Sequence, residues 1–386
     1  MFSLLVPLTT YCLTTNLDGS VTYTSFDNTG YGLKPWFGRN VALLTPTNQT
    51  LNASNMAAIL TALDAAWDYY QSTAAVGRQP SVLSSTTLFG HDTISVVNST
   101  CGAGCSYVGY TGTEMLPTYF NVLYGGYSSA GQFDQVLFYE LGRNFWLYGG
   151  QMEYHSPDID PIATGFAVYM RFASMDGAGV AGGPYNGYTF LDFRTAVTNL
   201  IDTYIAAPSF NWSNTFRISQ APPNPLGLGA TDLFASLLMR IGRDFGDPTF
   251  NQNIWKQVAQ RNVAFSTQQA VDNFALAASA TVHKNLLGMF TNTWKFPIST
   301  SAATEALQRW GPPVVLHPRL SFGVSQGTNL VLQWQSAVNT SYHLQSSPDA
   351  QIWSDVGAVI AGNARVMSLT TPVSSSSNAY FRLRLN

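Results

Sequence analysis

The sequence has few charged residues and no concentration of positive charge. Only 10% of its 386 residues are Asp, Glu, Lys or Arg, against about 25% in an average soluble protein, and the formal net charge is −3. The lack of a basic cluster excludes a protein that binds nucleic acid by neutralising phosphates. A disordered chain would need low hydrophobicity and high charge, whereas 46% of these residues are hydrophobic. No apolar run reaches the length of about 20 residues that a membrane span requires.

Glycine and aromatic residues take the place of the missing charge. The chain contains 32 Gly, 23 Phe, 19 Tyr and 9 Trp. This composition is common among secreted proteins that act on sugars or proteins. At about 150 residues per domain, the length indicates two or three domains.

The three cysteines bear on the compartment. Cys101 and Cys105 are separated by a segment with two glycines, which lets the chain turn tightly enough to join the sulfurs. We therefore expect a disulfide between them and an oxidising compartment; a metal site would need further ligands, and none follows the pair. Cys12 is expected to be a lone thiol. The apolar start has no basic n-region, so we expect a secreted or extracytoplasmic bacterial protein whose signal peptide is absent from this chain.

Hydrophobic periodicity predicts a main domain of strands followed mostly by helices. Short alternating stretches predict strands at 20–24, 41–44 and 93–97. Apolar residues at three- and four-residue spacing predict a helix at 56–70, which Asn52 or Ser54 can cap. Further helices are expected at 130–148, ending at Gly149-Gly150, and at 162–172, 190–205, 232–245, 250–260 and 267–290, the last one broken. Residues 1–312 are thus predicted to form an α+β domain.

The pattern changes to a period of two after Trp310-Gly311-Pro312-Pro313. Strands recur every 8 to 12 positions up to the alternating end at 380–385, which predicts a small all-β sandwich over 317–386. The segment "YHLQSSPDAQIWSDVG" resembles the immunoglobulin- or fibronectin-like modules appended to secreted bacterial enzymes. Such a module implies either a spacer or a glycan-binding role.

The segment Tyr139-Glu140-Leu141-Gly142-Arg143 has the frame of a zinc-binding helix. In a zincin protease, His-Glu-x-x-His places two imidazoles one turn apart on zinc, and the glutamate acts as general base. Here the glutamate is present, while Tyr139 and Arg143 stand at the two ligand positions.

Two later segments extend this resemblance. "IATGFAVYMRF" resembles the second active-site helix of gluzincin-type peptidases, in which a Glu before the Gly is the third zinc ligand; the aligned residue is Thr164. "FALAASATVHKNLLGMFTNTWKFPIS" resembles the closing segment of the same families. The three segments occur in the same order as in those families, over about 130–299. This resemblance implies a zincin-like fold related to basic-secretory-protein-like peptidases.

The residues at the three ligand positions of this sequence differ in chemical type from the zinc ligands of that family. Arg143 offers no lone pair to a cation, a neutral tyrosine is a poor zinc ligand, and Thr164 is poorer still. We therefore expect no bound metal, no cofactor and no classical zinc peptidase activity. One alternative is a peptidase with an altered metal site, in which His155 and the acids Glu153, Asp158 and Asp160 would join Glu140.

Without zinc, the helix still places Tyr139, Glu140 and Arg143 on one face. One interpretation is a Glu140–Arg143 pair that replaces the charge of the metal in an inactive relative, which would bind glycan or peptide. The other, slightly favoured, is a metal-independent hydrolase that acts on a polysaccharide or glycoprotein, as a glycosidase rather than a peptidase.

Glycoside hydrolysis requires two carboxylates, and a buried carboxyl with a raised pKa suits the acid/base role. Glu140 is the first candidate, and Glu153 or Asp158, in the loop after the helix, is the expected second. The residues expected to position the substrate are Tyr139, Arg143, Tyr154, His155 and Thr164.

Overall fold

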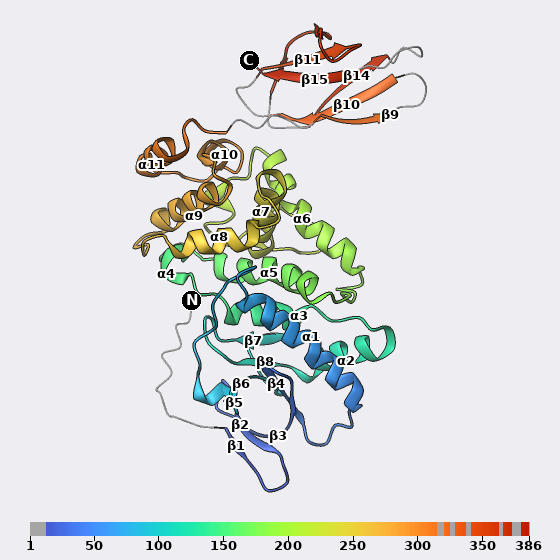
Figure 1. The fold of residues 1–386 in the computed structure, drawn as a ribbon, viewed down its shortest axis with the longest axis vertical. Helices are drawn as coiled ribbons and strands as arrows, with labels where there is room; N and C mark the ends of the chain where they lie inside the picture. Colours follow the sequence, from blue (N-terminus) through green and yellow to red (C-terminus); the bar gives the residue numbers. More distant parts are fainter. Residues whose placement is uncertain are drawn as a thin grey trace.

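The computed structural model describes residues 13–314, 320–324, 329–336, 341–362, 366–372 and 380–385. An N-terminal sheet is followed by a layer of helices and then by two small sheets at the opposite end of the molecule (Figure 1). The predicted α+β class of the main domain is confirmed. Cys12 and the predicted domain boundary at 317 lie outside the described residues. No helix in the described ranges combines the length and apolarity needed to cross a bilayer.

The N-terminal sheet is mixed, with β7 at one edge. Its path is β1-β2-β3-β4-β6-β8-β7, and β5 pairs with β6. The β4–β6 and β6–β8 pairs are parallel and the others antiparallel. The predicted strands at 20–24, 41–44 and 93–97 correspond to β2, β4 and β6. The bounds are β1 Thr14–Thr15, β2 Val21–Thr24, β3 Gly30–Phe37, β4 Val41–Pro46, β5 Thr87–Leu88, β6 His91–Val96, β7 Gly104–Ser106 and β8 Thr113–Met115.

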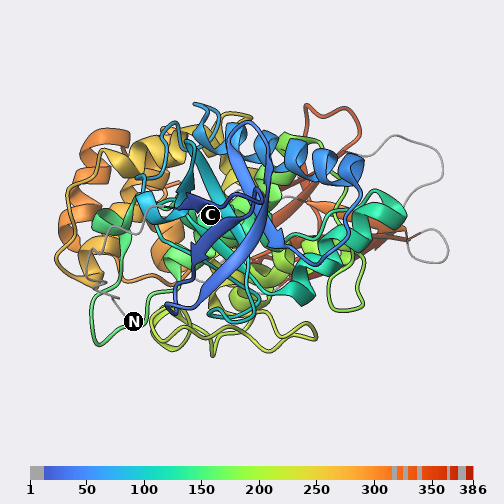
Figure 2. The ribbon, with the colours of Figure 1, turned by 90° about the horizontal axis from the view of Figure 1, so that it is seen from below.

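Strand β4 shows why the sheet lies in the interior. Its residues alternate between two cores: Val41 and Leu43 belong to the large core with the helices, and Ala42 and Leu44 to a smaller core on the other face. Because both faces are covered, the strand reads as a continuous apolar run. Figure 2 shows the helix α1 beside this sheet, seen from the end at which the sheet lies.

Eleven α-helices lie in the described part of the chain, and several match the prediction closely. In α1, the side chain of Asn52 accepts hydrogen bonds from the backbone N–H groups of Ser54 and Asn55, as expected of a cap. The predicted break after α9 is also confirmed, because His283 adopts a left-handed conformation there. The bounds are α1 Ala53–Gln71, α2 Pro117–Ala130, α3 Val136–Asn144, α4 Gly149–Met152, α5 Ile162–Ala178, α6 Phe190–Ala206, α7 Ala230–Phe245, α8 Phe250–Ala259, α9 Thr267–Val282, α10 Leu287–Asn292 and α11 Thr300–Trp310.

The predicted helix at 130–148 is wrong in its bounds. At 130 one helix ends, with Gly131 in the left-handed region (φ 64°), and α3 covers only Val136–Asn144. Gly149, expected after the end of the helix, begins α4. The apolar periodicity misled the prediction because Phe145 and Trp146 are buried core residues although they lie beyond the end of α3.

The C-terminal segment is all-β, as predicted. One antiparallel sheet has the order β14-β10-β9; in the other, β11 pairs with β12, β13 and β15. The rings of Trp334 and Tyr342, one from each sheet, are 6.0 Å apart. A sandwich of immunoglobulin type stays a prediction. The bounds are β9 Ser321–Val324, β10 Asn329–Gln335, β11 Ser341–Ser347, β12 Ser354–Asp355, β13 Ile360–Ala361, β14 Val366–Pro372 and β15 Tyr380–Leu385.

Candidate functional site

Helix α3 carries Glu140 and packs against both α5 and the edge strand β7. A glycine in the middle of the helix allows this packing. A Cβ on Gly142 would lie 2.9 Å from the hydroxyl of Tyr70 and 3.1 Å from the Cα of Ala167 in α5. Because any larger residue would push the two helices apart, Gly142 sets the distance between α3 and α5.

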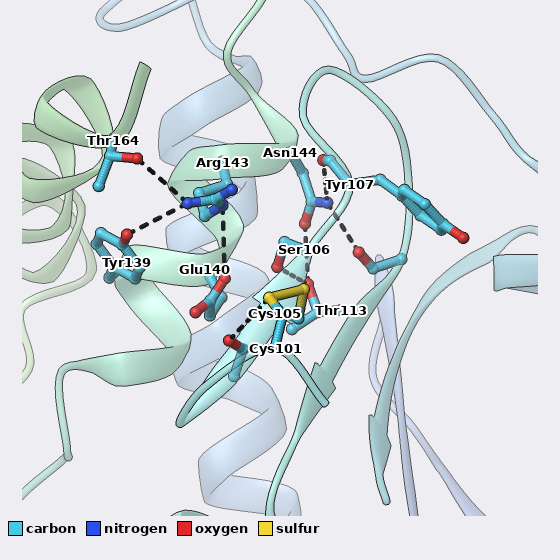
Figure 3. Close-up of polar contacts among 12 residues, drawn as sticks. Cys101, Cys105, Ser106, Tyr107, Thr113, Tyr139, Glu140, Arg143, Asn144 and Thr164 are labelled. Carbon is cyan, nitrogen blue, oxygen red and sulfur yellow. Dashed lines mark hydrogen bonds and ion pairs between the residues drawn. A yellow bond between two sulfur atoms is a disulfide. The ribbon is translucent and has the colours of Figure 1, made fainter. Parts of the chain in front are cut away.

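The end of α3 is fixed to the sheet by one buried side chain. The amide nitrogen of Asn144 donates to the backbone oxygens of Tyr107, Tyr110 and Gly112, at 3.1, 2.6 and 3.1 Å. Its amide oxygen accepts a hydrogen bond from the hydroxyl of Thr113 at 3.1 Å. Asn144 therefore ties the helix to β8 and to the loop between β7 and β8, next to Glu140 (Figure 3).

Arg143 lies at the point where the expected ligand positions meet. Its Nη1 donates to the hydroxyl oxygen of Tyr139 at 3.4 Å and to that of Thr164 at 3.3 Å, both long hydrogen bonds. Its Nε lies 3.9 Å from Oε2 of Glu140. The guanidinium thus faces three side chains from α3 and α5 at once, as Figure 3 shows.

Glu140 is a buried carboxyl, 3% exposed. Burial raises its pKa to about 7, and the positive charge of Arg143 and a hydrogen bond from Ser106 lower it in part. At 3.9 Å the contact between Glu140 Oε2 and Arg143 Nε is an ion pair, too long for a hydrogen bond. Within the described ranges, neither of these two atoms has a hydrogen-bond partner. The edge strand approaches closely, since a Cβ on Gly104 would lie 3.0 Å from Cγ of Glu140.

The three expected ligand positions do not fit zinc. Tyr139, Arg143 and Thr164 offer a neutral phenol, a permanent cation and a neutral hydroxyl, whereas zinc takes thiolate, imidazole or carboxylate ligands. Among the described residues, no group of three or more His, Cys, Asp or Glu side chains could hold a metal ion. The guanidinium itself lies where these side chains converge.

A cavity of about 240 Å³ lies beside Glu140. Among its described lining residues, the carboxylates are Glu140 and Asp232. Asp232 is held by Arg171, whose guanidinium donates to it at 3.4 Å and to Gln135 at 2.7 Å. The other lining residues are Ala103, Val136, Tyr139, Thr164, Val168, Tyr185, Leu226, Gly227, Leu228 and Thr231.

The expected second carboxylates do not lie at this cavity. Neither Glu153 nor Asp158 is among the described residues that line it. Asp158 instead accepts a hydrogen bond from Nε of Arg217 at 2.6 Å. Neither acid therefore faces Glu140 across this cavity among the described lining residues, and Asp158 is engaged by Arg217.

Tyr154 and His155, expected to position a substrate, also have other partners. The hydroxyl oxygen of Tyr154 accepts a hydrogen bond from Nε1 of Trp212 at 3.0 Å in the core. Nε2 of His155 lies 3.1 Å from the backbone oxygen of Ala264. Tyr154 and His155 are therefore not among the described lining residues of the cavity. The other predicted positioning residues are closer: Tyr139 and Thr164 line the cavity, and Arg143 contacts both.

Arg171 and Asp232 were missed from the sequence. Arg171 is the arginine of the quoted segment "IATGFAVYMRF", so the motif could have indicated it. Asp232 lies in the first turn of α7, where an acid normally reads as a capping residue. Only the packing of α7 on α5 shows that it reaches the cavity.

The disulfide predicted between Cys101 and Cys105 is confirmed. It closes the short loop that holds Ala103, which lines the cavity, and Gly104, which contacts Glu140.

Replacing both cysteines with serine is expected to lower the free energy of unfolding by about 2 kcal/mol, since the closed loop is short. Urea denaturation with and without a reducing agent measures this. Reductant should destabilise the wild type and leave the double variant unchanged; a wild type insensitive to reductant contradicts the prediction.

No family model matches the chain, and no curated protein does. Among solved structures, it is similar to a mutant of a functionally unknown conserved protein from Bacillus anthracis str. Ames, at 14% identity and a TM-score of 0.48, over 73% of this chain and 52% of that one. It is also similar to the ZmpB metallopeptidase from Clostridium perfringens, at 12% identity and a TM-score of 0.45, over 93% and 68% of the two chains. A third is the M60 catalytic domain of ZmpC from Clostridium perfringens, solved with the sialyl T antigen, at 13% identity and a TM-score of 0.45, over 92% and 70%. The chain spans about half the length of the first of these proteins.

Proposed function

We propose that this protein binds a glycan, as a polysaccharide or on a glycoprotein, in the cavity beside Glu140, without a metal ion and without cleaving peptide bonds. The observation that carries the proposal is the guanidinium of Arg143, hydrogen-bonded to both Tyr139 and Thr164. A permanent cation at this point opposes the binding of a second cation by charge repulsion. The cavity then serves to bind, and the zincin-like arrangement implied by the motifs has lost its metal chemistry.

The lining of the cavity suits a sugar. The amide of Gln135 and the hydroxyls of Thr164 and Thr231 offer uncharged hydrogen-bonding groups, and Tyr185 adds an aromatic ring. The carboxylate of Asp232 is balanced by Arg171. This mixture fits a largely neutral, hydroxyl-rich ligand. The Cys101–Cys105 disulfide fits a secreted or extracytoplasmic location.

A glycan panel tests the binding function, with Tyr185→Ala as the site variant and Tyr188→Ala as the matched control. Tyr188 lies in the same loop but is 38% exposed and is not among the described lining residues. Loss of the Tyr185 ring should weaken binding roughly tenfold, and loss of the Tyr188 ring should change it little. Binding to no glycan in a broad panel, or stoichiometric zinc together with peptide cleavage, contradicts the proposal.

A metal-independent glycoside hydrolase is the second candidate. It is favoured by the presence of two carboxyls, Glu140 and Asp232, at one cavity. The raised pKa of Glu140, about 7, suits a general acid. If the wild type cleaves a polysaccharide, Glu140→Gln should lower the rate by about 10²-fold or more and leave binding intact. Equal cleavage by both proteins would remove Glu140 from the mechanism.

A further inference from the structure

The three positions that the motifs assign to metal ligands come together in space. Tyr139 and Arg143 lie one turn apart on α3, and Thr164 lies near the start of α5. Although 21 residues separate Arg143 from Thr164, their side chains are hydrogen-bonded. The three positions therefore lie together in space, and one of the three side chains is a cation.

The charge of Arg143 is placed where a buried carboxyl needs it. Its guanidinium is the cation that forms an ion pair with Glu140 among the described residues. The guanidinium of Arg171, which lines the cavity, is already engaged by Gln135 and Asp232. An ionised carboxyl in a buried position is costly without a nearby positive charge.

We infer that Arg143 is an internal replacement for a metal ion: its guanidinium joins α3 to α5 through Thr164, contacts Tyr139 on its own helix, and supplies positive charge beside Glu140. The inference concerns how the site is held together, so it stands whether the cavity only binds a ligand or also cleaves it. It implies that the site is stable without metal. It also implies that replacing these three side chains with zinc ligands would produce a zinc site.

The shape of arginine matters for this role. A guanidinium offers five N–H groups in a rigid planar fork, so one side chain can face Tyr139, Thr164 and Glu140 together. A lysine ammonium is a compact point charge on a flexible stem. Arg143→Lys is therefore expected to keep the charge but not the connection between the two helices.

The decisive experiment replaces all three positions, as Tyr139→His/Arg143→His/Thr164→Glu. The variant then has two imidazoles and one carboxylate, a ligand set that binds zinc. After dialysis against zinc and then buffer, we expect one zinc per chain by elemental analysis, whereas the wild type holds none. Zinc should raise the melting temperature of the variant by several degrees and leave that of the wild type unchanged.

A matched control keeps both imidazoles but lacks the third ligand: Tyr139→His/Arg143→His/Thr164→Ala should bind zinc at least tenfold more weakly. A triple variant with wild-type circular dichroism that binds no more zinc than this control overturns the inference.

If the triple variant does not fold, single variants decide. Arg143→Ala should melt several degrees below the wild type, and millimolar methylguanidinium should recover part of the loss by entering the vacated space. Arg143→Lys should recover less than half of the difference. If Arg143→Ala melts at the same temperature as the wild type, the guanidinium does not stabilise the contact between α3 and α5, and the inference is wrong.

Discussion

Replacing Asn144 with alanine is expected to lower the free energy of unfolding by about 3 kcal/mol. The side chain is fully buried; its two amide N–H groups are shared among three backbone oxygens, and its amide oxygen accepts from the hydroxyl of Thr113. Its removal takes this donor from all three backbone oxygens, although the Gly112 oxygen still accepts from the N–H of Tyr107. Losing a donor from a buried acceptor costs more than the net value of an ordinary hydrogen bond. Urea denaturation at neutral pH measures the change.

Asn55→Ala is the matched control, because Asn55 also donates from its amide nitrogen, to the hydroxyl of Ser128, but near the surface. This variant should remain within about 0.5 kcal/mol of the wild type. Since Asn144 directly follows Arg143, Asn144→Ala should also weaken ligand binding at the cavity, by displacing the end of α3. Equal stability of the two variants would show that Asn144 does not anchor the helix.

The helices with the clearest sequence signals were predicted within a few residues. In α7, Leu233, Leu237 and Ile241 recur every four residues and are all buried, so the apolar face marks the helix. The bounds of α3 were harder to predict, because Phe145 and Trp146 are buried for reasons of tertiary packing. The periodicity of apolar residues indicates which residues are buried. Because buried residues also occur beyond the end of a helix, it does not mark where the helix ends.

The candidate site could be predicted in part. The spacing in the motif placed Tyr139, Glu140 and Arg143 on one face, and the structure shows their side chains together. The other carboxyl that lines the cavity, that of Asp232, could not be predicted, because it reaches the cavity from a helix far along the chain. The resemblance to zincins favoured Glu153 or Asp158, in the loop after the helix, and neither residue is among the described lining residues of the cavity.

Replacing Asp92 with asparagine is expected to change the pH dependence of stability. Burial raises the pKa of Asp92 to about 8, while hydrogen bonds from the backbone of Gly112 and Thr93 lower it in part. The folded protein therefore keeps this carboxyl protonated up to about pH 8, whereas the unfolded chain releases the proton near pH 4. Between these values the unfolded state binds fewer protons, so stability falls as the pH rises.

Asparagine keeps the acceptor for the Gly112 N–H, which Asp92 Oδ1 accepts at 2.6 Å, and has no proton to lose. The stability of Asp92→Asn relative to the wild type should therefore rise by about 2 kcal/mol between pH 5 and pH 7, measured by urea denaturation at both values. Asp247→Asn is the control: hydrogen bonds from Thr249 lower the pKa of this exposed acid, so it is ionised in both states over that range. Its difference from the wild type should be constant with pH. An equally constant difference for Asp92→Asn would mean that Asp92 is ionised in the folded protein, despite its burial within β6.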